Sequence, residues 1–179
     1  MLRQGFTATT VDEICEKAKV TKGAFFHYFK SKDELGKAVL VYHCQLSGGQ
    51  AAQASYRGEK DPFQRLMKYA DFVVESVKDP IDHGCLLGVF SSELSRNKKP
   101  IREMCSHAFT AWAEDIASML DQVAKENPRS RKINSREWAG YFIAVFEGSL
   151  ILAKAQSDLA PLQSGIKLWK EHIKTIFAI

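Results

Sequence analysis

The sequence predicts an all-α protein, because apolar residues recur at intervals of three and four while the alternation typical of strands is missing. The chain has 179 residues, 45% of them apolar and 26% charged, which is enough to bury a hydrophobic core. Its 5 prolines, 11 glycines and lack of biased segments exclude a disordered or collagen-like protein. We expect a short helical head, residues 1–46, joined to a larger helical body, residues 47–179.

The head begins with two short helices that meet across a turn. Thr10 and Glu13 form a capping-box pattern that opens a helix over residues 11–18. After a turn of about three residues, Thr21 can cap a second helix over residues 22–29. Two short helices in this arrangement are typical of a helix-turn-helix unit.

A longer helix connects the head to the body. Ser31 and Glu34 repeat the capping-box pattern at its start, and we expect the helix to fray near Gly48 and Gly49.

The body is predicted to hold further helices, separated by prolines and polar runs. Their expected ranges are 62–79 after the Asp61 cap, 86–95, 100–127, 135–156 with Ser135 as cap, and 161–179, with a loop over 129–134. The helix over 135–156 is apolar on nearly all sides and must therefore be covered on all sides. A second copy of the chain is the natural cover, so we expect a homodimer through 138–156 and 166–177.

Cysteine spacing and hydropathy limit the compartment and the class of protein. The four cysteines are 29, 41 and 20 residues apart, without a CxxC pair, which argues against a zinc site or a disulfide framework. The most apolar window, 139–153, has 15 residues and contains Glu147, and no leader is recognised at the N-terminus. We expect a cytoplasmic protein with reduced thiols, no cofactor, no metal and no membrane contact.

The charge is concentrated in the head. The net charge is +4, and residues 1–60 hold nine Lys and Arg against six Asp and Glu. A basic head on a near-neutral body indicates an anionic partner, although many solvated surfaces look the same.

The head also resembles a known family. The pattern starts at Gly5-Phe6, continues through Thr9-Thr10-Val11 and Ile14, and runs unbroken from Val20 to Leu35, including Lys22-Gly23-Ala24-Phe25-Phe26-His27-Tyr28-Phe29. Over some 30 residues it resembles the DNA-binding head of TetR/AcrR-type transcriptional regulators. The resemblance implies a homodimeric repressor whose body binds a small effector and whose heads grip a near-palindromic operator of double-stranded DNA.

The resemblance also implies which residues contact DNA. Thr10 and Lys32 are carried over as phosphate contacts, Thr21, Lys22, Gly23 and Ala24 as the groove-facing start of the recognition helix, and Phe26, His27 and Tyr28 as flanking contacts. The residues themselves agree, since Phe25 and Phe29 share an inward face and leave Lys22, Phe26 and His27 on another. Many members carry tyrosine where Phe26 stands, and phenylalanine cannot donate a hydrogen bond to a phosphate. A packing role for the Phe26 ring is therefore as well supported as a DNA contact. Family members also carry a full helix before the Gly-Phe pair, and here only residues 1–4 precede Gly5. We therefore expect the helix-turn-helix core to lack one of the three helices that enclose it.

A second resemblance concerns the body. Gly84-Cys85-Leu86-Leu87-Gly88 and the run from Glu147 to Lys154 resemble a subgroup in which a Gly-Cys-Leu turn lies beside the effector pocket. In parts of that subgroup the cysteine senses oxidants or electrophiles, and elsewhere it packs. Lys154 would approach Cys85 and favour the reactive thiolate. The candidate pocket lining is Phe72, Leu87, Phe90, Phe109, Trp112, Phe142 and Phe146, a stripe that also fits an ordinary core.

Two other classes of protein remain as alternatives. The 5 histidines and the cysteines would permit catalysis, but no nucleophile elbow, phosphate-binding glycine loop or HExxH motif occurs, so we do not expect an enzyme. A helical ligand-binding or adaptor protein that does not bind DNA is the closer alternative, because of the shortened head.

Overall fold

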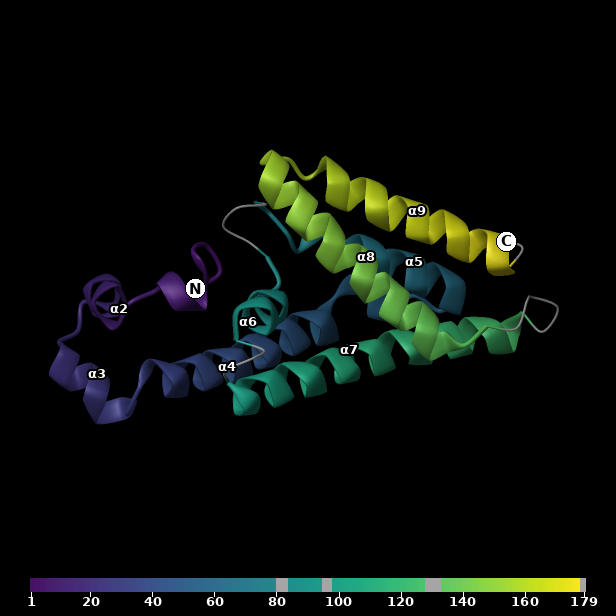
Figure 1. Cartoon of the computed structure of the whole chain (residues 1–179). Helices are drawn as coiled ribbons and strands as arrows, with labels where there is room; N and C mark the ends of the chain where they lie inside the picture. Colours follow the sequence, from purple (N-terminus) through teal and green to yellow (C-terminus); the bar gives the residue numbers. More distant parts are fainter. Residues whose placement is uncertain (80–83, 95–97, 128–132, 178–179) are drawn as a thin grey trace. The chain divides into compact units, whose positions relative to one another are not determined.

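The computed structural model describes residues 1–79, 84–94, 98–127 and 133–177, and these residues confirm the all-α fold (Figure 1). Within these ranges no strand occurs. The helices are α1 (Gly5–Ala8), α2 (Val11–Ala18), α3 (Lys22–Tyr28), α4 (Lys32–Gln53), the 3-10 helix η1 (Ser55–Gly58), α5 (Pro62–Glu75), α6 (Leu86–Leu94), α7 (Lys99–Glu126), α8 (Ser135–Gln156) and α9 (Ala160–Phe177).

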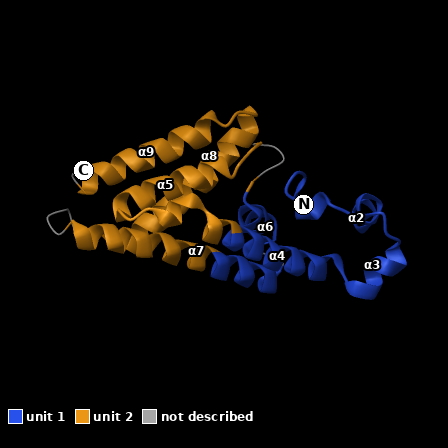
Figure 2. Ribbon diagram, turned by 180° about the vertical axis from the view of Figure 1, so that it is seen from behind, with its two compact units in different colours: residues 1–49, 85–108 blue, residues 50–84, 109–179 orange. Residues whose placement is uncertain are grey.

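The chain forms two compact units, which Figure 2 colours separately. Unit 1 comprises residues 1–49 and 85–108, and unit 2 comprises 50–84 and 109–179. Our sequence-based division placed all of 47–179 in one body, whereas the structure groups 85–108 with the head. The physical reason lies in the contacts of α6, whose Phe90 packs edge to face on Phe6 of α1 at 5.2 Å between ring centroids.

Unit 1 is built from short capped helices. In α2 the predicted capping box is present in both directions, since Thr10 Oγ1 accepts from Glu13 N and Glu13 Oε2 accepts from Thr10 N. The helix ends at Lys19, which adopts a left-handed conformation with φ 55° and so redirects the chain toward α3. The start of α4 differs in part from the prediction, because the Glu34 carboxylate accepts from Lys30 N while Ser31 Oγ accepts from Glu34 N.

Unit 2 packs α5, the later part of α7, α8 and α9 around a core that contains Leu66, Phe142 and Trp169, each 0% exposed. The helices α8 and α9 lie side by side (Figure 1), and α5 packs against α9 and η1. The helices α8 and α9 approach closely at Gly165, where a Cβ atom would lie 2.2 Å from Ser149 Oγ and 3.3 Å from a methyl group of Val145, so a larger residue would force these side chains to shift. Among the described residues, α8 is the helix that is long and apolar enough to cross a membrane, while its Phe142 and Phe146 are buried in this core.

Several predicted boundaries were wrong. The helix α4 continues through Gly48 and Gly49 to Gln53, because both glycines face open space and no neighbouring group interrupts the helix. The helix α5 ends at Glu75 rather than 79, and η1 was not predicted.

The start of α8 was also assigned to the wrong cap. Asn134 caps this helix by accepting from the amides of Arg136 and Glu137, while Ser135 donates to the Asp121 carboxylate on α7. The predicted helix ends and loop at positions 80, 95, 128–132, 178 and 179 lie outside the described residues.

Candidate nucleic-acid interface and effector site

The helix α3 presents its first turn to solvent. Thr21 is its N-cap, with Oγ1 accepting from Ala24 N at 3.1 Å, as the sequence predicted. Lys22, Gly23 and Ala24 follow and are exposed. At Gly23 a Cβ atom would meet Thr21 Oγ1 at 3.7 Å and nothing closer, so the backbone is open to approach from outside.

The rest of α3 divides into a buried face and an exposed face. Phe25 is 5% exposed and lies between the rings of Phe26, at 5.1 Å, and Phe29, at 5.8 Å. Phe26 and Tyr28 are 51% and 77% exposed, and the His27 ring rests edge-on against Tyr28. The exposure of Phe26 shows that its ring is available to a partner, although its edge still packs on Phe25.

Lys22 is held near the start of α3 by a surface ion pair. Its Nζ lies 2.7 Å from Asp12 Oδ1 on α2, and this carboxylate raises the pKa of Lys22. Both side chains are largely exposed, so the pair stabilises the free protein little. Lys22 can therefore exchange Asp12 for a phosphate at small cost.

Lys32 has partners within the protein in addition to the phosphate contact that was predicted for it. Its Nζ donates to the carbonyl oxygens of Phe6, Thr7 and Thr9, at 2.9, 3.2 and 2.8 Å. A lysine ammonium has three N–H donors, so these carbonyls use all of them. The phosphate contact of Lys32 stays a prediction, and the structure shows the side chain bound within unit 1.

The body contains an aromatic cluster around Trp112. Its ring lies 6.3 Å from Phe109, 5.5 Å from Phe146 and 6.4 Å from Phe142. Its Nε1 donates to the hydroxyl of Tyr69 on α5, and burial raises the pKa of that hydroxyl. Phe72 joins the cluster through the ring of Tyr56, which lies 5.4 Å from Phe72 and 5.3 Å from Tyr69.

The predicted pocket lining is divided between the two units. Phe72, Phe109, Trp112, Phe142, Phe146 and Lys154 belong to unit 2, whereas Cys85, Leu87 and Phe90 belong to unit 1. Phe90 is 0% exposed and packs on Phe6, so it serves the core of the head unit. Sequence reasoning missed Tyr56, Tyr69 and Trp169, although Tyr69 lies three residues after Leu66 on the buried stripe of α5.

The cysteines have distinct surroundings. Cys15 and Cys105 are buried, Cys44 is exposed and Cys85 is half-buried, and none of them forms a disulfide. Burial raises the pKa of the Cys105 thiol, and partial desolvation of the Cys44 sulfur raises the pKa of that thiol although the residue as a whole is exposed. Cys85 precedes the first turn of α6, where its carbonyl accepts from Val89 N at 3.1 Å. Within the described residues no group of three or more His, Cys, Asp or Glu is placed to hold a metal ion.

Comparison with known proteins gives two family matches, the second of which includes residues 85–108 that the structure groups with the head. Residues 1–39 match the family described as bacterial regulatory proteins, tetR family, and residues 62–167 match the C-terminal domain described as transcriptional regulator LmrA/YxaF-like. The chain belongs to the TetR family of bacterial regulatory proteins. Both matched domains are described as domains of transcriptional regulators.

Individual relatives of this TetR-family chain are similar along nearly its whole length. The HTH-type transcriptional repressor NemR of Escherichia coli (strain K12) is 26% identical over 99% of this chain and 87% of NemR. Among solved structures, the regulatory protein TetR from Rhodobacter sphaeroides has a TM-score of 0.85 at 24% identity, covering 96% of this chain and 91% of that one. The reduced form of E. coli NemR has a TM-score of 0.79 at 23% identity, covering 98% and 89%. These two structures share the fold.

The head of this TetR-family chain carries an apolar groove of about 580 Å³ within unit 1. The segment Met1–Gln4 lines it together with side chains from α2, α4 and the start of α6. Its main apolar residues are Leu2, Ile14, Ala18, Leu35, Val39, Tyr42, Leu46 and Leu86. On this side of the head α1 is a single turn of four residues.

His43 lines the same groove, and we expect it to make the stability of the head depend on pH. Burial lowers the pKa of His43 below its ordinary value of 6.5, so the folded head favours the neutral ring. The unfolded chain binds a proton more readily, and the unfolding free energy therefore falls as the pH drops through 6.5 and levels off below the folded-state pKa. We expect wild type to lose more stability between pH 7.5 and 5.5 than His43→Gln, as measured by urea denaturation. Equal losses in both proteins would show that protonation of His43 costs the folded state nothing.

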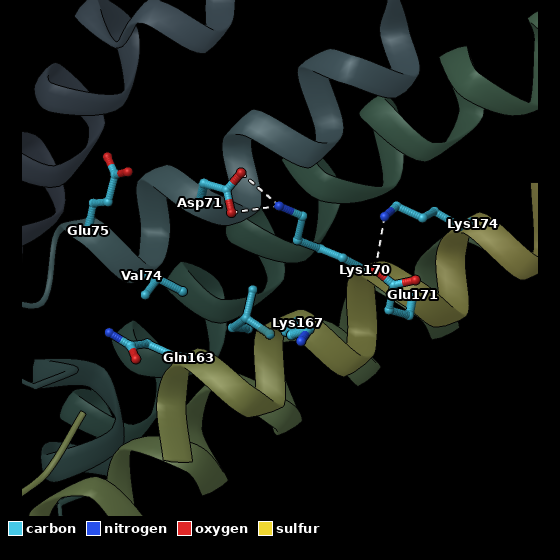
Figure 3. Close-up of a pocket in the computed structure, with 9 residues that line it drawn as sticks. Asp71, Val74, Glu75, Gln163, Lys167, Lys170, Glu171 and Lys174 are labelled. Atoms are coloured by element: carbon cyan, nitrogen blue, oxygen red, sulfur yellow. Dashed lines mark hydrogen bonds and ion pairs between the residues drawn. The ribbon is translucent and has the colours of Figure 1, made fainter. Parts of the chain in front are cut away.

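A second, smaller groove of about 300 Å³ lies on unit 2 between α5 and α9 (Figure 3). Lys170 points across it and donates to both carboxylate oxygens of Asp71, at 2.6 and 2.7 Å. Lys174 is paired with Glu171 on the same helix at 2.9 Å. These two ion pairs involve four of the charged residues that line the groove, and Glu75 and Lys167 line it as well.

Proposed function

We propose that this chain is a ligand-responsive transcriptional repressor that binds a near-palindromic operator as a homodimer. The observation that carries the proposal is the exposed, capped start of α3, where Lys22 is held by a weak surface pair and Gly23 leaves the backbone open. Phosphate contacts fix the register of such a helix, and side chains in the major groove read the bases. The relatives named as repressors support the direction of regulation.

An uncharged exposed face on α8 and α9 supports the homodimer. On α8 the side chains of Tyr141, Ile151 and Leu152 are 43%, 69% and 53% exposed, and on α9 Leu168 is 70% exposed. The two helices are joined along this face by Tyr141 and His172, whose rings lie 6.3 Å apart. Large apolar side chains clustered in this way favour a partner surface, and a two-fold axis lets the same face cover itself.

The aromatic cluster of unit 2 is our proposed effector site. Trp169 Nε1 is buried and has no acceptor among the described residues, and its ring lies 4.8 Å from Phe142. The Tyr69 hydroxyl accepts from Trp112, while its own hydrogen has no acceptor in the described part of the chain. Buried donors without acceptors are costly. An apolar, ring-containing effector with a carbonyl or similar acceptor would relieve that cost.

Operator binding is tested by selecting genomic fragments on filters with the purified chain, with and without added residues before Met1. Recovery of a common near-palindromic sequence is the expected result. Because the two recognition helices of a dimer enter successive major grooves, its half-sites should be about 34–36 Å apart. Recovery of fragments without a shared sequence by both proteins would favour a ligand-binding or adaptor protein instead.

We further propose that Cys85 is a thiol sensor for oxidants or electrophiles. It lies at the start of α6, where the helix dipole favours a thiolate, whereas Cys44 and Cys105 have raised pKa values. One solved relative is described as a reduced form, NemR of E. coli.

Alkylation with iodoacetamide at neutral pH tests this sensor. We expect Cys85 to label faster than Cys15, Cys44 and Cys105 in the folded protein, because the thiolate is the reacting species. Cys85→Ser should keep operator binding and lose its release by a thiol-reactive inducer, whereas the matched variant Cys44→Ser should keep both. If the inducer still releases the Cys85→Ser protein from the operator, the inducer acts without forming a bond to this thiol.

A further inference from the structure

The four-residue helix α1 is held at its N-terminal end by a carboxylate from α6. Glu93 Oε2 accepts from Thr7 N at 2.7 Å. The site depends on a glycine, because Gly5 has φ +86° and a Cβ atom there would lie 1.9 Å from Glu93 Oε1. The carboxylate therefore sits directly over the first turn of α1.

The C-terminal end of α1 is held by Lys32, the first residue of α4. Its ammonium binds the carbonyls of Phe6, Thr7 and Thr9, and it lies 4.6 Å from the centroid of the Phe6 ring. All three N–H donors of the ammonium are used in this way. A phosphate contact by Lys32 would require breaking at least one of these hydrogen bonds.

The two charges match the polarity of the helix. A carboxylate is favourable at a helix N-terminus and an ammonium at its C-terminus. A helix of one turn does not hold itself together, since the nucleation of an isolated helix is unfavourable. Packing supplies the rest, because Phe6 is 3% exposed, lies against Phe90, and approaches α4 so closely that a Cβ atom at Gly36 would be 2.7 Å from its ring.

We propose that Lys32 and Glu93 are positioning residues for operator binding, which clamp the two ends of α1. The clamp sets the place of Thr10, which follows α1 and caps α2, relative to the first turn of α4. Lys32 then supports DNA binding through protein carbonyls rather than through a phosphate. Operator affinity also comes to depend on Glu93, a residue of α6 that lies outside the helix-turn-helix. This inference rests on the proposed function, because it needs an operator.

The test measures operator Kd against salt concentration for Lys32→Ala, Glu93→Gln and Lys22→Ala. We expect Kd to rise about tenfold in Lys32→Ala and about threefold in Glu93→Gln, with the salt slope of wild type retained in both. Lys22→Ala should instead lower the salt slope by about one per site. The matched controls are Lys37→Ala, which removes the same charge from α4, and Glu103→Gln on α7, whose carboxylate pairs with Lys99. Both controls should bind as wild type does.

Hydrogen exchange of the Thr7 amide gives a readout without DNA. We expect faster exchange in Glu93→Gln than in Glu103→Gln. A salt slope lowered in Lys32→Ala as in Lys22→Ala would overturn the proposal and restore a phosphate contact. Unchanged Kd and unchanged Thr7 exchange in Glu93→Gln would overturn it as well.

Two further measurements distinguish a failure of the clamp proposal from a misfolded variant and from a protein that does not bind DNA. If Lys32→Ala does not fold, Lys32→Met keeps the apolar stem and is measured in its place, and Glu93→Gln changes an exposed side chain. If wild type selects no operator, the proposed function fails, and Thr7 exchange in the same variants still decides whether Glu93 holds α1.

Discussion

Leu168→Glu is expected to convert the proposed dimer into a monomer at micromolar concentration and to abolish operator binding. Leu168 is 70% exposed on α9, so the substitution leaves the core of unit 2 intact. In a two-fold interface each protomer would bury one unpaired carboxylate, and such a charge costs about 3–5 kcal/mol. Two of them should raise the dimer Kd by well over about 100-fold. Sedimentation velocity across a concentration series measures the change.

The neighbouring residue supplies the matched control. Lys167→Glu changes the charge one position earlier on α9, at a side chain that lines the groove toward α5 and not the uncharged face. This variant should remain dimeric and bind the operator. A specific dimer of this kind should bury about 2,000 Å² or more. A wild-type monomer, or a Leu168→Glu dimer of unchanged affinity, would place the interface elsewhere.

Local signals predicted most of the head. The bounds of α2 agree with the sequence because a capping box fixes its start and a left-handed residue ends it, and both are local effects. The start of α8 was misassigned because either Asn134 or Ser135 can cap a helix. The choice depends on Asp121, fourteen residues earlier, which takes the Ser135 hydroxyl.

The site was harder to predict where a residue's partner comes from a distant segment. The sequence gives Lys32 as a basic residue at a helix start, and nothing local shows that three carbonyls of residues 6–9 bind its ammonium. Phe90 was predicted as pocket lining because its apolar spacing does not reveal which partner buries it, and that partner is Phe6. Periodicity identifies a buried face, but it does not identify the element that covers it.

Gly23→Ala is expected to change folding stability and operator affinity in opposite directions. In the free protein a Cβ atom at position 23 meets Thr21 Oγ1 at an ordinary 3.7 Å, so alanine fits without strain. Alanine is the better helix former by about 0.5–1 kcal/mol, and the unfolding free energy should therefore rise. If the start of α3 approaches DNA closely, the added methyl group separates the backbone from its partner, and Kd should increase about tenfold or more.

Gly48→Ala is the matched control for this last effect. Gly48 also lies in a helix, α4, and has nothing within 4 Å of an added Cβ atom, so its replacement should stabilise the fold to a similar degree. It is not one of the predicted contacts, and operator affinity should be unchanged. Urea denaturation and filter binding on the same preparations measure both quantities. If Gly23→Ala is more stable than wild type and binds the operator as tightly as Gly48→Ala, the start of α3 does not approach the DNA groove closely. This conclusion is safe because a stabilised protein has no folding defect that could hide an effect on DNA binding.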